Sequence, residues 1–135
     1  MNLPIQERIA RLEAKHGALP PPWVAFDGHP CSIGWRMGGG EHYMEYWWAW
    51  WKRQAMPEDR KIAYFQRWRP PHAWPAFVIL AIWGVSLHRD PENASPLFVQ
   101  LKLLGFGDRE DYERDLKDPK WFKPKWPKKN KFTDG

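Results

Sequence analysis

The residue types that most often carry chemistry gather around one glycine-rich segment. It reads Ser32-Ile33-Gly34-Trp35-Arg36-Met37-Gly38-Gly39-Gly40-Glu41. A glycine loop that leads into a helix exposes backbone N–H groups and can hold an anion, here with Arg36 as reinforcement. The segment lacks the Lys-Ser/Thr pair and the spaced glycines of nucleotide-binding loops, and Glu41 would repel a phosphate. We therefore predict a tight turn in which Arg36 pairs with Glu41 or with another acidic residue. A small ligand-binding or enzymatic site on these two residues is kept as an alternative hypothesis.

Residues of metal-ligand and nucleophile types lie on both sides of this segment. They are His29, Cys31, His42 and Glu45. Structural zinc sites show closely spaced ligand pairs, usually with several cysteines, and this chain has one cysteine. A Cys31 nucleophile with a histidine base would lack a third member to orient the base. The sequence therefore predicts no metal, no cofactor and no catalytic residues.

Basic and aromatic residues alternate in the C-terminal tail, residues 117–135. Residues 1–113 carry 13 Lys/Arg and 13 Asp/Glu, so the net charge of +5 belongs to the end of the chain. Alternating cations and rings suit single-stranded nucleic acid, through phosphate contacts and base stacking. The other interpretation is that the rings dock back onto the domain while the Lys heads stay in water. The residues of the nucleic-acid hypothesis are Lys120, Trp121, Lys123, Lys125, Trp126, Lys128 and Lys129.

Length and composition limit the elements that can position these groups. The chain has 135 residues with 11 Trp and one Cys, which fits one compact domain in a reducing compartment. No apolar run approaches the roughly 20 residues that a membrane span needs. The N-terminus has no basic start followed by an apolar stretch, as a signal peptide would. We expect a cytoplasmic protein that does not bind membranes.

The apolar periodicity predicts a mainly α fold, a small single-domain bundle of five to six helices. The domain is expected over 1–116, with an irregular Gly/Pro-rich loop at about 20–40 that holds a short strand at 23–26. Asp108 is expected to cap the last helix, and Ser95-Pro96 to begin the one before it. The expected helices cover residues 4–16, 41–55, 57–68, 72–85, 97–104 and 108–116.

The expected helix over 41–55 is unusually rich in aromatic residues. At 100° per residue its aromatic arc is about 200° wide, against the roughly 100° that a one-sided surface helix needs. Such a helix should be buried on more than one side. It is either central in a bundle, or central and also in contact with a partner.

A set of Trp, Tyr, Pro and Gly positions between residues 20 and 85 resembles a pattern found in small uncharacterised bacterial proteins, some of them immunity partners of secreted or polymorphic toxins. The resemblance covers about residues 20–85, roughly half the chain. It implies a cytoplasmic binder that neutralises a cognate toxin, and it carries over no catalytic residues. The matching positions are Pro22-Trp23, the run from Ser32 to Glu41, Tyr43, Trp47, Trp51, Tyr64, Pro71 and Trp74.

The leading hypothesis is a non-enzymatic, immunity-type inhibitor that occludes the active site of a cognate toxin with a preformed surface. We expect this surface at 27–45, where the loop meets the aromatic helix. An exposed Trp is the expected anchor, because Trp is enriched in binding hot spots. Whether the chain also forms a homodimer is left open. The expected partner-binding residues are Arg36, Glu41, His42, Glu45, and Trp48 or Trp51.

Overall fold

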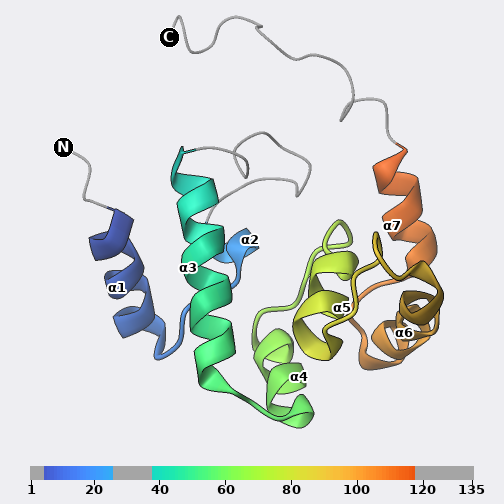
Figure 1. The fold of residues 1–135 in the computed structure, drawn as a ribbon, viewed down its shortest axis with the longest axis horizontal. Helices are drawn as coiled ribbons and strands as arrows, with labels where there is room; N and C mark the ends of the chain where they lie inside the picture. The colour runs from blue at the N-terminus through green and yellow to red at the C-terminus, as the bar shows by residue number, and fades with distance from the viewer. Residues whose placement is uncertain (1–4, 26–37, 118–135) are drawn as a thin grey trace, which may run out of the picture.

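The protein is mainly α-helical, as the sequence predicts. The computed structural model describes residues 5–25 and 38–117, and within them the chain forms seven helices and no strand (Figure 1). None of these helices has the length and apolar character needed to cross a membrane. The helices are α1 (Ile5–His16), α2 (Pro22–Ala25), α3 (Gly38–Gln54), α4 (Glu58–Arg67), α5 (Pro75–Trp83), α6 (Pro91–Leu104) and α7 (Arg109–Leu116).

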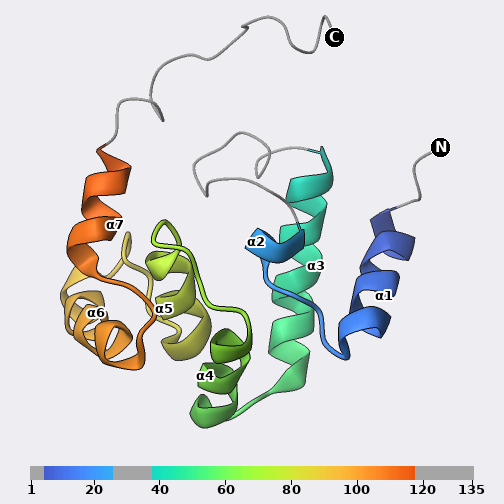
Figure 2. The ribbon, with the colours of Figure 1, turned by 180° about the vertical axis from the view of Figure 1, so that it is seen from behind.

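The helices follow the chain from one end of an elongated molecule to the other. The long helix α3 stands beside α1 and α2, α4 and α5 occupy the middle, and α6 and α7 lie at the far end (Figures 1 and 2). The buried apolar cluster nevertheless runs from Ile9 of α1 to Tyr112 of α7. The described helices therefore share one continuous core.

Helix α3 is the centre of the aromatic core, and the prediction that it is buried on more than one side is confirmed. Its buried rings face three neighbours. The Trp50 indole N–H donates to Glu13 of α1 at 3.2 Å, that of Trp47 to the Tyr64 hydroxyl of α4 at 3.0 Å, and that of Trp51 to the Ala81 carbonyl of α5 at 2.9 Å. A buried indole N–H needs such an acceptor, so these bonds fix α3 against all three helices.

Two tyrosine hydroxyls hold the proline-rich connector against α3 and α4. Tyr43 donates to the Pro20 carbonyl, and Tyr64 donates to the Leu19 carbonyl while accepting from Trp47. A buried carbonyl without a donor destabilises a fold by about 1–3 kcal/mol. Burial raises the pKa of both tyrosines well above its ordinary value. The neutral, proton-donating forms are therefore part of the folded state.

The predicted strand at 23–26 is wrong, because residues 22–25 form the short helix α2. Pro22 stands at its first position, where a missing N–H breaks no helical bond and the fixed φ suits a helix. The N–H groups of Val24 and Ala25 donate to the Pro21 carbonyl at 2.9 and 3.3 Å. Four apolar residues were too short a run to separate a strand from one helical turn.

Three other helix starts differ from the sequence predictions by three residues or more, and one of them is that of α5, which begins at Pro75 rather than at residue 72. Helix α3 begins at Gly38 rather than Glu41, so the glycines form its first turn instead of a break. Helix α6 begins at Pro91 after an Asp90 cap, so Pro96 lies inside it. Asp90-Pro91 and Ser95-Pro96 are equivalent start signals five residues apart. The Ser95 hydroxyl instead accepts from the Arg109 guanidinium at 3.0 Å.

The acidic cap of α7 is confirmed. The Asp108 carboxylate accepts from the backbone N–H of Glu110 at 2.9 Å. That hydrogen bond, with Lys102 nearby, lowers the pKa of Asp108. The negative charge therefore stays at the N-terminal end of α7, where the helix dipole favours it.

Gly84 ends α5 in a conformation that disfavours other residues. Its φ is +72°, and its N–H donates to the Leu80 carbonyl at 2.9 Å. We expect Gly84→Ala to lower the free energy of unfolding by about 1 kcal/mol, measured by urea denaturation. A Cβ at this position would contact nothing within 4 Å, so the loss would report backbone strain alone. Gly84→Asn should lose less, because Asn tolerates this conformation; equal stability of the Ala variant and the native chain would contradict the argument.

Candidate functional site

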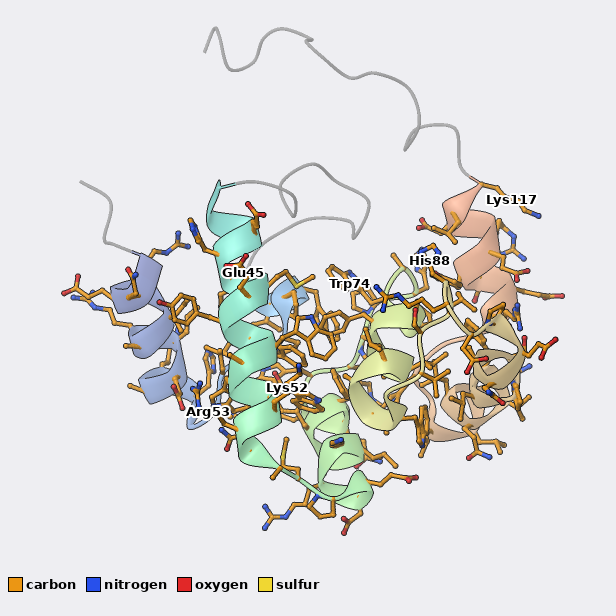
Figure 3. The ribbon with its side chains drawn as sticks, viewed as in Figure 1. Glu45, Lys52, Arg53, Trp74, His88 and Lys117 are labelled. Carbon is orange, nitrogen blue, oxygen red and sulfur yellow. The ribbon has the colours of Figure 1, made fainter. Side chains whose placement is uncertain are left out.

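The exposed side of α3 consists of two parallel stripes of residues. Glu41, Glu45, Trp48 and Lys52 follow one another at spacings of four, three and four positions, and so do His42, Tyr46, Ala49 and Arg53. Residues spaced three or four apart share one face of a helix. In Figure 3, Lys52 points to the side of α5 and Arg53 to the side of α1. The first stripe therefore borders α5, and the second borders α1.

An apolar surface patch lies where the first stripe meets α5. The half-buried Trp48 ring packs against the half-buried Phe77 ring, with 5.1 Å between centroids. Leu80, one turn after Phe77, is 39% exposed, so the two share one face of α5. We call Trp48, Phe77 and Leu80 the Trp48 patch. It is a preformed apolar surface contributed by two helices.

The Trp48 patch rests on a rigid layer of rings. Phe77 lies 5.0 Å from the buried Trp47, 5.4 Å from the buried Trp74 and 5.8 Å from Trp23. Figure 3 shows Trp74 between α3 and α5. Because the rings below are packed against one another, a partner would meet Trp48 and Phe77 already ordered. Little conformational entropy would then be lost at the patch on binding.

A polar rim borders the patch on α3. Glu41, Glu45 and Lys52 are all exposed, and they belong to the same stripe as Trp48. The structure thus brings three of the predicted partner-binding residues, Glu41, Glu45 and Trp48, to one face. An apolar centre with a charged, solvated rim is the ordinary anatomy of a protein interface.

Two of the predicted partner-binding residues lie elsewhere on α3. Trp51 is 4% exposed and bonds to the Ala81 carbonyl of α5, so the prediction of Trp51 as an exposed anchor is wrong. The Trp51 side chain lies on the face of α3 that packs against α5, so α5 covers it. His42 is exposed but belongs to the second stripe. Of the two candidate Trp anchors, the structure leaves Trp48 accessible.

One buried indole beside the patch has no acceptor within the part of the chain that the structure describes. The N–H of Trp23 is the buried side-chain polar atom for which the described part of the chain provides no hydrogen-bond partner. The Trp23 ring is held by Phe65, Trp74 and Phe77 at 5.3–5.9 Å. An unpaired buried donor is unfavourable, so packing alone keeps Trp23 in this layer.

Several predicted residues fall outside the described part of the chain. Arg36 and its predicted pairing with Glu41 lie there, and so do His29 and Cys31. The tail residues of the nucleic-acid hypothesis, Lys120, Trp121, Lys123, Lys125, Trp126, Lys128 and Lys129, lie there as well. Over residues 5–25 and 38–117, no three His, Cys, Asp or Glu side chains converge as a metal site would require.

Phe77 and Leu80 were not predicted as surface residues. The segment 72–85 is apolar on nearly every side, which indicates a helix buried all round. The structure covers most of α5 but leaves the Leu80 side open. The spacing of apolar residues in 72–85 does not indicate which side of α5 remains exposed to solvent, because that depends on how α3, α4 and α6 pack around it. The wide aromatic arc was the one feature of the sequence that indicated an exposed apolar surface, and it indicated this for α3 and not for α5.

The comparisons with known proteins add no relatives. No protein-family model, curated protein or solved structure matches this chain.

Proposed function

We propose that this chain is a non-enzymatic binding protein, an immunity-type inhibitor that uses the Trp48 patch to cover the active site of a cognate bacterial toxin. The observation that carries the proposal is the patch itself. An ordered Trp and an exposed Leu from two packed helices form an apolar centre, and charged side chains of α3 border it on one side. Trp is the residue type most enriched among those that dominate binding energy. The resemblance of residues 20–85 to immunity proteins supplies the class of partner.

The rim favours a partner surface with basic groups facing the first two turns of α3. Glu41 and Glu45 stand there, and both belong to the stripe of Trp48. Lys52, two turns further along, would face an acidic group. Complementary charges of this kind raise the association rate and fix the orientation of the partner more than they raise the affinity. Occlusion of the toxin's active site needs a rigid inhibitor surface, and the packed ring layer below the patch provides it.

The proposal requires a gene beside this one to encode a toxin-domain protein, and the test mixes that protein with the full chain. We expect nanomolar binding in calorimetry and loss of toxin activity in the mixture. Leu80→Asp puts a charge into the apolar centre and Trp48→Ala removes the anchor, so each should weaken binding about 100-fold, or about 2.7 kcal/mol. Both side chains are at least partly exposed, so the variants should stay folded by circular dichroism.

Matched variants separate the patch from the rest of the surface. Tyr46→Ala removes an exposed aromatic ring from the second stripe of α3, and Val99→Asp places the same charge on the exposed face of α6. Both should change the affinity less than about threefold. Native affinity of the Leu80→Asp variant would contradict the proposed site. Failure of the toxin to bind the native chain would contradict the proposed function.

A further inference from the structure

A second apolar surface lies at the other end of the molecule, on α6. Val99 is 60% exposed and Leu103 is 77% exposed, and the exposed Pro96 lies one turn before Val99. The spacings of three and four place these residues on one face of the helix. We call them the α6 strip. The opposite face, with Phe98 and Leu101, is buried in the core, so the strip contributes nothing to the packing of α6 in the described structure.

Helix α7 begins beside this strip and is firmly held there. The Arg109 guanidinium bonds to the Ser95 hydroxyl at 3.0 Å and lies 4.5 Å over the Phe98 ring, and Lys102 pairs with Asp108 at 3.5 Å. Asp115, near the other end of α7, pairs with His72 at 3.5 Å. Helix α7 is therefore held by α6 at its beginning and by the residues before α5 near its end. Figure 3 shows Lys117 at the end of α7 that points away from α6.

The part of the chain that forms α6 and α7 has a net negative charge, and the segment that follows α7 is basic. Residues 90–116 contain seven Asp/Glu and three Lys/Arg, a net charge of −4. Residues 118–135 contain six Lys and two Asp, a net charge of +4, together with two Trp and two Phe. The two parts are complementary. Each contains apolar side chains, and the net negative charge of residues 90–116 is opposite to the net positive charge of residues 118–135.

The chain is long enough to join them. The eight residues of α7 span about 12 Å. From Lys117, an extended chain covers about 13 Å to Trp121 and about 30 Å to Trp126. These two rings can therefore reach the α6 strip by running back along α7, with the lysines between them facing the acidic residues.

We infer that residues 118–135 dock in cis on the α6 strip, with Trp121 and Trp126 over Val99 and Leu103 and the lysines against the acidic residues of α6 and α7. Docking removes the exposed apolar side chains of both parts from water, and tethering makes the event intramolecular, with a high effective concentration. Residues 118–135 are then bound to the helical domain of the same chain. This inference is independent of the Trp48 patch.

Limited trypsin digestion of the full chain tests the inference, because the bonds after Lys120, Lys125, Lys128, Lys129 and Lys131 are cleaved only when the segment is free; Lys123 precedes Pro124 and is not a trypsin site. At low ionic strength these sites should be cleaved about tenfold more slowly than in a synthetic peptide of residues 118–135. In 0.5 M NaCl the difference should shrink, because salt screens the charge attraction. Equal cleavage rates in the chain and the peptide at low salt would overturn the inference.

A variant of the strip locates the docking surface. The double variant Val99→Ser/Leu103→Ser should bring cleavage to within about twofold of the peptide rate, since it removes the apolar surface without changing charge. Leu80→Ser, an exposed apolar site on α5, should leave the protection unchanged. Protection that persists in the double variant, or that rises with protein concentration as docking between two copies would require, would overturn the assignment.

Discussion

Trp47→Ala is expected to lower the free energy of unfolding by about 4 kcal/mol, among the largest losses from any single substitution in this chain. The Trp47 side chain is fully buried, stacks on Trp51 with 4.8 Å between centroids, and donates to the Tyr64 hydroxyl. Its removal leaves a cavity between α3, α4 and α5 and takes a donor from a buried hydroxyl. For a domain whose total stability is about 5–15 kcal/mol, this loss is a large fraction. Guanidinium denaturation followed by circular dichroism measures it.

Two companion substitutions identify the cause of the loss. Trp47→Phe keeps a ring in the site but removes the indole donor, so we expect about half of the effect. Tyr46→Ala changes the adjacent residue of α3, which is 40% exposed, and should alter the stability by about 0.5 kcal/mol or less. A Trp47→Ala variant within 1 kcal/mol of the native chain would show that the ring layer does not hold the helices together.

The helices were predictable because their signals are local. Asp108 caps α7 as expected, and Gly105 ends α6 with a φ of +80°, as a glycine after an apolar run indicates. The errors arose where two local signals compete. Asp90-Pro91 and Ser95-Pro96 both mark a helix start, and the contact between Ser95 and Arg109 of another helix favours the first. Such tertiary contacts do not show in a sequence pattern.

The candidate site was predictable only in part, for a related reason. The wide aromatic arc of α3 correctly indicated a helix with more apolar surface than one neighbour covers. Trp48 and Trp51 nevertheless stand at neighbouring positions of that arc, and the position of α5 decides which one is covered. Helix α5 buries Trp51 through the Ala81 carbonyl and meets Trp48 only with the edge that carries Phe77. The same placement exposes Leu80, so the patch is a property of the packing of α3 against α5.

The free energy of unfolding is expected to fall steeply above about pH 10. Burial is the largest cause of the raised pKa values of Tyr43 and Tyr64, and for Tyr64 it outweighs the opposing hydrogen bond from Trp47. In the unfolded chain both phenols lose their protons near pH 10, while the folded chain keeps them. Below pH 10 the two states bind the same number of protons at these sites. Above it the folded state binds two more, and the free energy of unfolding falls by about 2.7 kcal/mol per pH unit.

The structural reason for the alkaline loss is that both hydroxyls act as donors. A phenolate at Tyr43 or Tyr64 could not donate to the carbonyl of Pro20 or Leu19 and would face it with a negative charge. Denaturant midpoints measured from pH 8 to 11.5 should show the fall, and Tyr43→Phe should halve its slope to about 1.4 kcal/mol per pH unit. Tyr46→Phe, at an exposed position on the same helix, should leave the slope unchanged. A flat midpoint through pH 11.5 would mean that these hydroxyls do not anchor the connector between α1 and α2.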